Sequence, residues 1–447
     1  MELSRILSRY IKTTNFEDMP EEVVDFTKTC TLDYFASAFI GATTEPIKII
    51  DAFIKEMGGD KQVSLITSGK SSVMNAVLVN GAASHIAELD DIHKSSVIHA
   101  ATVVIPTALA VAEAENKTGK DLIAAITIGY EVCYRIGEAV TPSHYYYWHN
   151  TATCGTFGAV AAAAKLLELN EEQIIHALGN AGTQAAGLWQ FIEDGAMSKQ
   201  LHPGKAAMNG VLSAYLSKKG FTGARQILEG DRGFFKAMST DYDAKKITNE
   251  LGNEFKIMEN SFKVHASCRH THSAMDLMIA LRQEGVITLE EIDSIIVRTY
   301  QTAIDITDNS NPTTQYESKF SLQFCTALAF IEGQGGLDKF NNDTLWSTDI
   351  RDLMNRVKIT IDREVDMSYP EKWGASINIY LTNGEVIERK TLFPKGDPEN
   401  AVNTEDIKSK FEKLAVNLSE KDKKYFIDYL LNLENMDDVR KLMSYTQ

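Results

Sequence analysis

The chain has 447 residues, a formal net charge of −16, 44% hydrophobic residues and 9 prolines. This length and composition are typical of a folded protein with two domains and not of a disordered chain. The excess negative charge disfavours nucleic-acid binding, because an acidic surface repels the phosphate backbone. The 5 cysteines are widely spaced and form no Cys-x-x-Cys pair, which indicates a reducing compartment.

The N-terminal segment has no cationic start followed by an apolar run, so we expect no secretory signal. The longest apolar stretches are interrupted by charge or glycine well before they could span a bilayer. We therefore expect a cytoplasmic protein with no membrane partner.

Residues 1–258 have the apolar spacing of three and four that is typical of successive helices. One helix is predicted from Pro20 to Gly41, another over residues 121–140, and a third after Asn170, which is a good N-cap followed by two acids. Three further helices are rich in small residues, which let helix axes approach closely: 81–89, 100–114 and 151–167.

The pattern changes at about residue 259. Alternating β-branched residues predict four strands, at 292–300, 357–362, 375–381 and 386–392, with helices at 318–332 and 345–354. Asn383-Gly384 predicts a type I′ hairpin turn between the last two strands. Helical spacing then returns after Pro394–Pro398.

We therefore expect a mostly α protein, with a large all-α helical domain (1–258 plus 396–447) and an inserted smaller α+β domain (259–395). Such an insertion is suited to act as a lid.

Polar groups capable of acid–base chemistry are concentrated in HIAELDDIHKSSVIH, residues 85–99. Its carboxylates and histidines leave the helical pattern and enter a loop, where they can converge on a cavity: Glu88, Asp90, Asp91, His93 and His99. The competing interpretation is a solvated helix end with capping carboxylates, which two histidines make less attractive.

Two further candidates lie at predicted helix starts. His149 directly precedes the small-residue helix, where backbone N–H groups favour anions. Lys199, His202 and Lys205 lie between Gly195 and the next helix, in what we expect to be a loop. This segment is not a P-loop, because it lacks the glycine and hydroxyl positions that ATP binding requires. We therefore expect it to bind carboxylates.

The densest cluster is SFKVHASCRHTH, residues 261–272, which includes Lys263, Cys268 and Arg269. Its His-x-His pair permits a metal site completed by Asp90, Asp91 or His93. The adjacent Lys and Arg favour an anionic ligand instead, so we expect no metal and no cofactor.

These groups suit elimination of water or CO₂ beside a carboxylate. A histidine near neutral pH can move the proton at carbon, and fixed cations can stabilise the enolate-like charge that develops. His99 or His149, together with Lys199 and Lys263, meets that requirement.

At these residues the chain resembles the MmgE/PrpD family, nearly from end to end. The resemblance is carried by residues 85–99, 149–167, 197–210, 262–272, 318–324 and 395–400. It implies a large all-α domain with a smaller lid, a homodimer, and a cofactor-free lyase acting on a small anionic di- or tricarboxylate.

The resemblance also implies residue roles. His99 resembles the histidine that protonates the substrate carbon, and Lys199 and Lys263 resemble the lysines that hold carboxylates; His149 is the fourth catalytic candidate. The remaining polar residues of the motifs are expected to bind substrate: Glu88, Asp90, Asp91, His93, His202, Cys268 and Arg269.

Several positions depart from the decarboxylase pattern, with Glu88 in place of Asp, Ile92 in place of Thr and Cys268 in place of His. Dehydration, decarboxylation and epimerisation of an iminodisuccinate-like dicarboxylate therefore stay open. Outside this reaction class, a metal-dependent hydrolase and a carboxylate-binding protein without turnover also stay open.

Overall fold

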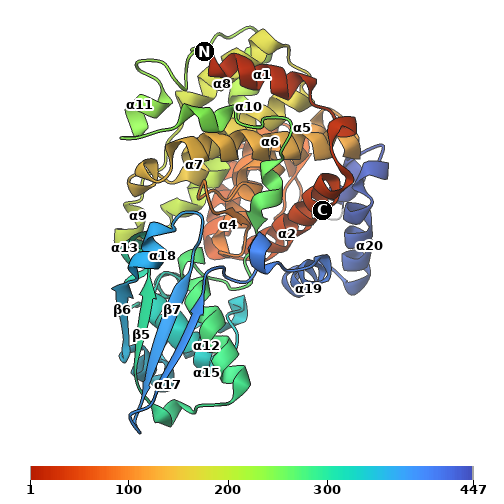
Figure 1. Cartoon of the computed structure of the whole chain (residues 1–447). Coiled ribbons are helices and arrows are strands. Elements are labelled where there is room, and N and C mark those ends of the chain that lie inside the picture. Colours follow the sequence, from red (N-terminus) through yellow and green to blue (C-terminus); the bar gives the residue numbers. More distant parts are fainter. Residues whose placement is uncertain (1, 445–447) are drawn as a thin grey trace. The chain divides into compact units, whose positions relative to one another are not determined.

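The computed structural model describes residues 2–444, which fall into two compact units. The first unit comprises the residues up to Asn260 and those from Asn403 onward, and the second comprises Ser261–Val402. Most of the described residues are helical, and the largest sheet lies in the second unit (Figure 1). The expected fold class, mostly α with a smaller α+β part, is confirmed.

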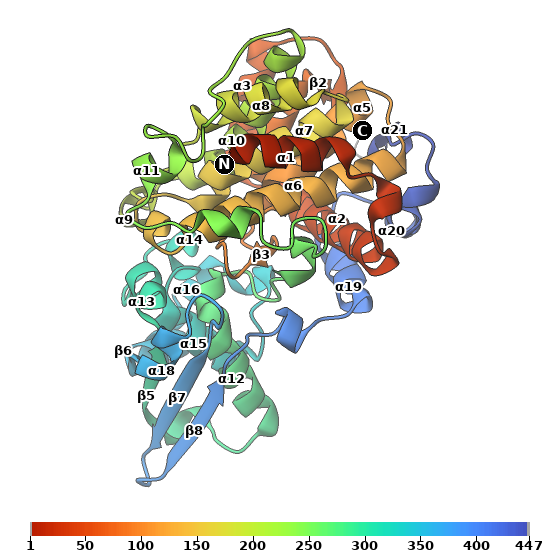
Figure 2. The ribbon, with the colours of Figure 1, turned by 45° about the horizontal axis from the view of Figure 1, so that its top comes forward.

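The first unit is a stack of helices around a core of small and aliphatic side chains. Figures 1 and 2 show α6 and α7 side by side, and α10 packs on both α7 and α4. The helices of this unit are α1 (Leu3–Thr13), α2 (Glu21–Gly41), α3 (Glu45–Met57), α4 (Val73–Ile86), α5 (Ala101–Ala114), α6 (Gly119–Val140), α7 (Asn150–Leu166), α8 (Glu171–Gly182), α9 (Phe191–Asp194), α10 (Ser198–Lys218), α11 (Phe234–Met238), α19 (Thr404–Leu414), α20 (Glu420–Leu431) and α21 (Arg440–Met443).

Local signals explain several helix starts in this unit. The Asn170 side chain accepts a hydrogen bond from the backbone N–H of Gln173 and so caps α8, as predicted. Thr118 and Asp121 form a capping box at the start of α6, which begins two residues before the predicted helix. Two short strands, β1 (Val63–Ser64) and β2 (Lys70–Ser71), pair before α4.

Glycines allow the central helices to cross closely. A Cβ on Gly204 of α10 would lie 2.2 Å from the carbonyl oxygen of Leu78 in α4. A Cβ on Gly158 of α7 would lie 2.7 Å from the carbonyl oxygen of Gly129 in α6. Any larger side chain would force these helices apart. The predicted close packing is therefore confirmed for the small-residue helix 151–167 at Gly158.

The second unit is a four-stranded sheet with helices packed on it. Its strands are β5 (Ile292–Thr299), β6 (Val357–Ile361), β7 (Ala375–Leu381) and β8 (Val386–Thr391), in the order β6-β5-β7-β8. The β5–β6 pair is parallel, and the other two pairs are antiparallel. The helices of this unit are α12 (His272–Glu284), α13 (Gln301–Thr307), α14 (Gln315–Ser318), α15 (Leu322–Glu332), α16 (Asn342–Leu345), α17 (Thr348–Met354) and α18 (Arg363–Met367).

Two local predictions in this unit need correction. The predicted helix 318–332 begins later, at Leu322 of α15, because the Ser321 side chain accepts a hydrogen bond from the backbone N–H of Phe324 and so caps the helix there. The β7–β8 turn is not type I′, since only Gly384 in it has a positive φ, of 90°. The backbone N–H of Gly384 donates to Leu381, so a three-residue loop ends on a left-handed glycine.

Within residues 2–444 we find no helix that is both long enough and apolar enough to cross a bilayer.

Candidate active site

The loop between α4 and α5 carries the acidic and histidine residues of the 85–99 motif. α4 ends at Ile86, and Glu88 then adopts a left-handed backbone with φ of 58°. The short strand β3 (Ile92–His93) follows, and the His93 N–H donates to the carbonyl of Ile98 across 2.9 Å. These turns fold the segment back on itself, so that His99 lies beside the acidic residues just before α5 begins.

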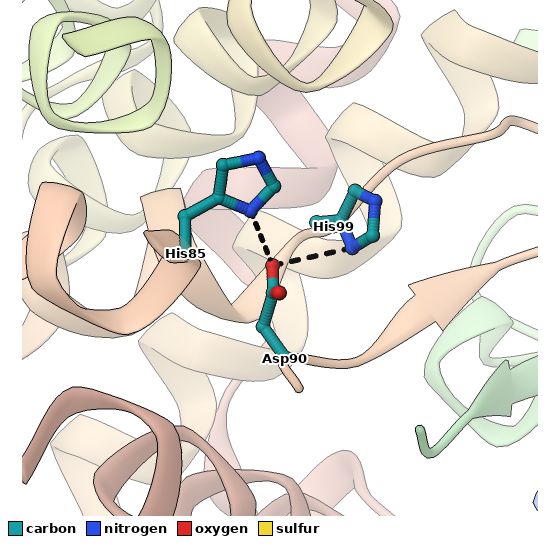
Figure 3. A group of neighbouring side chains, drawn as sticks. All are labelled: His85, Asp90 and His99. Carbon is teal, nitrogen blue, oxygen red and sulfur yellow. Dashed lines mark hydrogen bonds and ion pairs between the residues drawn. The ribbon is translucent and has the colours of Figure 1, made fainter. Parts of the chain in front are cut away.

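Asp90 binds two histidines with one oxygen. Its Oδ2 lies 2.6 Å from Nδ1 of His85 and 3.2 Å from Nδ1 of His99 (Figure 3). Burial alone would raise the pKa of Asp90, but the two imidazoles hold this pKa well below its ordinary value. Asp90 is therefore a buried carboxylate whose charge is balanced by imidazole N–H groups.

The hydrogen bonds of His99 fix its tautomer. Nδ1 of His99 lies 2.6 Å from the carbonyl oxygen of Asp91 and also faces the Asp90 carboxylate. Both neighbours are acceptors, so Nδ1 must carry a proton. In the neutral ring the lone pair is then on Nε2, which is the atom able to take up and return a proton. The His99 side chain is 10% exposed, which is compatible with contact to a small ligand.

His149 and His202 extend this group of imidazoles. His149 is the N-cap residue of α7, as predicted, and its ring stacks on His85 with centroids 5.6 Å apart. Its Nδ1 lies 3.1 Å from Nδ1 of His202 in α10. Burial is the main cause that lowers the pKa of both rings, for His202 to about 4. Both rings are therefore neutral at pH 7.

A buried ion pair brings a cation close to these histidines. The Lys199 ammonium contacts the Glu88 carboxylate, and the two side chains are 3% and 2% exposed. The expectation of a loop here was wrong, because α10 begins at Ser198 and its first turns include both Lys199 and Pro203. Pro203 is the sixth residue of this helix, so it removes the backbone hydrogen bond that an N–H at this position would donate to the carbonyl of Lys199. Lys205 of the same helix is exposed.

Asp91 holds the loop in place through hydrogen bonds to both of its carboxylate oxygens. Oδ2 accepts hydrogen bonds from the Tyr130 hydroxyl at 2.7 Å and from the Asn260 side chain at 2.8 Å. Oδ1 accepts from the backbone N–H of Ala101 at the start of α5. Burial raises the pKa of Asp91 to about 7. The predicted contact of Asp91 with substrate stays a prediction.

His93 contacts a different set of polar groups. Its Nδ1 lies 2.8 Å from the Ser96 hydroxyl, and its Nε2 lies 3.1 Å from Oε2 of Glu259. The Lys256 ammonium contacts both Glu259 and Glu138 beside it. These contacts account for the burial of His93, and its predicted role in substrate binding stays untested.

The predicted residues of the second unit are all buried. Lys263 is 1% exposed. Arg269 forms an ion pair with Asp397 at 2.5 Å and donates to the carbonyl of Lys395, so it holds the 395–400 segment. The Cys268 side chain is buried as well, and its backbone N–H donates to the carbonyl of Lys319.

Two groups of potential metal ligands occur among the described residues: His85, Asp90 and His99, and His93, Glu138 and Glu259. In the first group both Nδ1 atoms face oxygen acceptors and carry protons, whereas a metal ligand must offer a lone pair. In the second group the Lys256 ammonium already contacts both carboxylates. Neither donor set is therefore arranged for a cation as it stands.

The sequence did not single out His85, although it is the first residue of the 85–99 motif. It lies in the last turn of α4 and is 0% exposed. Its position six residues before Asp91 and five before Asp90 carried no helical or strand spacing that would pair it with either. Only the loop fold brings its ring to Asp90.

Buried imidazoles around one carboxylate, with a buried ammonium nearby, define an acid–base site suited to an anionic ligand. Residues 5–247 match the MmgE/PrpD N-terminal domain and residues 265–435 match the MmgE/PrpD C-terminal domain. The chain belongs to the MmgE/PrpD family, so the resemblance seen in the sequence is confirmed.

Two of the named relatives match nearly the whole chain, and a third matches about half of it. The cis-aconitate decarboxylase-like protein of Aspergillus oryzae is 26% identical over 98% of this chain and 96% of its own length. The cis-aconitate decarboxylase of Aspergillus terreus is 26% identical over 96% of this chain and 92% of its own length. The mitochondrial 2-methylcitrate dehydratase of Yarrowia lipolytica is 25% identical over 52% of this chain and 46% of its own length. The expected enzyme class, a lyase of the MmgE/PrpD type, is confirmed.

Proposed function

We propose that this enzyme removes water or CO₂ from a small di- or tricarboxylate by proton transfer through a histidine. The observation that carries the proposal is the group of four imidazoles around Asp90, three of them buried, with the Lys199–Glu88 pair beside it. The names of the relatives, which are decarboxylases and a dehydratase, support the same reaction class.

His99 is the proposed acid–base group. Nδ1–H of His99 is bonded to the Asp91 carbonyl and faces the Asp90 carboxylate, so Nε2 is the ring atom proposed to exchange a proton with the substrate. In dehydration, Nε2 removes the proton from the substrate carbon, the carbon–carbon double bond forms as the neighbouring C–O bond breaks, and the protonated ring returns this proton to the leaving hydroxyl, which departs as water. In decarboxylation, the bond between the substrate carbon and its carboxylate breaks and releases CO₂. The Nε2–H of the protonated ring then gives its proton to the substrate carbon, which has kept the electron pair.

Lys199 is the proposed carboxylate clamp in the first unit. An ammonium has three N–H donors, so it can keep its contact with Glu88 and still donate to a substrate carboxylate. A buried cation stabilises the enolate-like charge more strongly than an exposed one, because solvent does not screen it. Lys263 in the second unit is proposed to hold a carboxylate as well.

To identify the substrate, the protein is incubated separately with citrate, 2-methylcitrate, cis-aconitate and iminodisuccinate, and the products are detected by NMR. Loss of water or CO₂ from one of the first three supports the proposal. Conversion of iminodisuccinate alone would instead favour an epimerase. An epimerase would use the same carbon-acid step, and the imidazole pair His149–His202 gives it a second proton carrier.

Exhaustive chelation separates the proposed lyase from a metal-dependent hydrolase and from a carboxylate binder without turnover. Turnover that persists after chelation excludes the hydrolase, and any turnover excludes the binder. We also propose a homodimer, which the molar mass from light scattering in solution would test.

A further inference from the structure

Asp90 offers a single oxygen to two competing histidines. Its Oδ2 receives the Nδ1 of His85 at 2.6 Å and the Nδ1 of His99 at 3.2 Å, as Figure 3 shows. Its Oδ1 is buried and has no hydrogen-bond partner among the described residues. Both rings therefore share one carboxylate oxygen, and the shorter of the two contacts is the one with His85.

The polar contact of His85 is confined to Asp90. Nδ1 donates to the carboxylate, while Nε2 is buried and has no hydrogen-bond partner among the described residues. Aromatic contacts hold the ring in place, with centroids 5.0 Å from His99 and 5.6 Å from His149. Nδ1 of His85 must carry a proton, because its partner is a carboxylate oxygen and can only accept.

We propose that His85 is a positioning residue that limits the negative charge Asp90 presents to His99, and so sets the pH at which His99 exchanges its proton. The inference rests on the proposed role of His99 and adds a residue to that site. A carboxylate stabilises a neighbouring imidazolium through its charge, and a donor on the same oxygen reduces that effect. Without the His85 donor, the full negative charge of Asp90 would stabilise the protonated ring of His99.

The other titratable and charged groups around this pair are the same in all variants of the test. His149 and His202 face it from α7 and α10, and Lys199 from α10 is neutralised by Glu88. On the side of the loop lies Asp91, and beyond it Asp33 of α2 is paired with Lys410 of α19. Because these groups are common to all variants, a difference between variants reports on His85.

The test follows the titration of His99 in the full-length protein labelled with [2-¹³C-ring]histidine. The His99 resonance is assigned by its loss in His99→Asn. His85→Phe keeps an aromatic ring but removes the donor, and we expect the His99 midpoint to rise by about one pH unit. His85→Asn is the matched control, because its side-chain amide can donate from the position of Nδ1. We expect its midpoint to stay near that of the wild type.

Two results would overturn the proposal: an unchanged midpoint in His85→Phe, or the same rise in both variants. Asp90→Asn should move the midpoint in the opposite direction, to lower pH, because it removes the charge itself. A loss of packing alone would not produce shifts of opposite sign.

The wild-type protein gives a test that needs no folded variant. Its ¹⁵N spectrum should place the proton of neutral His85 on Nδ1, and an Nε2–H tautomer would overturn the proposal. Neither measurement uses a substrate. A protein that turns over none of the four polycarboxylates would therefore defeat the proposed function, while the titration would still decide the coupling between His85 and His99.

Discussion

The Nδ1 atoms of His149 and His202 lie 3.1 Å apart, so one ring donates its proton and the other accepts it. The two rings cannot both carry a proton on Nδ1. At most one of them can be a cation, because an imidazolium has no lone pair to accept the bond. Burial lowers the pKa of both rings, so the pair is neutral at pH 7, and His149 is the next acid–base candidate after His99.

His99→Asn should retain the fold and substrate binding but reduce proton exchange at the substrate carbon by about 10²–10⁴-fold. The asparagine amide can still donate to the Asp91 carbonyl, as Nδ1 does at 2.6 Å, but it cannot transfer a proton. Incorporation of solvent deuterium into substrate or product measures the effect. His144→Gln is the control, because His144 is a buried histidine bonded to Thr153 and Met238. Normal deuterium incorporation in His99→Asn would show that His99 is not the acid–base group, and His149 would become the next candidate.

Lys199→Ala should lower both activity and stability, because it removes the clamp and takes from the buried Glu88 carboxylate the ammonium that it contacts. Breaking a buried pair costs about 3–5 kcal/mol of stability, and losing one stabilising donor costs about two orders of magnitude in rate. The double variant Lys199→Met with Glu88→Gln should restore the unfolding temperature but not the rate. Lys218→Ala, at an exposed position at the end of the same helix, should change neither. Recovery of the rate in the double variant would contradict the clamp.

Lys263→Ala should weaken the binding of substrate and the stabilisation of its charge, with a loss in kcat/KM of about 10²-fold. Steady-state kinetics on the substrate identified by the assay panel would measure it. Lys358→Ala removes an exposed lysine from β6 of the same unit and serves as the matched control. Equal values of kcat/KM in Lys263→Ala and the wild type would show that Lys263 does not bind the substrate.

Acid should destabilise the protein in part through His144. Burial lowers the pKa of His144 from its ordinary value of 6.5 to about 4. As the pH falls, the unfolded chain therefore binds the proton first. The contribution of His144 is present above pH 6.5 and is lost as the pH falls toward 4, reaching about 3 kcal/mol.

The unfolding temperature at about pH 7.5 and about pH 5 tests this prediction. His144→Gln cannot titrate, so it should lose less stability between the two pH values than the wild type does. Equal losses would show that His144 does not contribute to the acid sensitivity.

We predict that the second unit moves as a lid when substrate binds. Substrate should then change amide hydrogen exchange at the two connections between the units, near residues 256–262 and 394–403. A lid must open to admit substrate and close to exclude water. Exchange at both connections that is identical with and without substrate would count against the prediction.

Elements with a strong local cause could be predicted from the sequence, because their signals lie within a few residues. Asn170 marked the start of α8, and alternation over 375–381 marked β7. The start of α10 was misjudged because Pro203 is tolerated within its early turns. The β7–β8 turn was misjudged because Asn-Gly also suits the loop in which Gly384 alone is left-handed.

The sequence indicated candidate residues for the site but not the geometry that joins them. His99, His149 and Lys199 were recognised by residue type and by family resemblance, and these do not reveal which atoms meet. The position of His85 against Asp90 depends on how the loop after α4 folds back. The approach of His202 and Lys199 to that loop depends on the close crossing of α4 and α10 at Gly204. Such contacts between distant segments have no local signal.

The Lys410 ammonium of α19 contacts both the Asp33 carboxylate and the carbonyl oxygen of Leu89, the residue directly before Asp90. α19 follows the second unit in the chain and packs on α2 of the first unit. During synthesis, the ribosome must therefore produce the whole second unit before the acid–base loop receives this support. A nascent chain stalled before Lys410 would contain every histidine of the site, yet its loop would lack the tether that fixes Leu89 and Asp90.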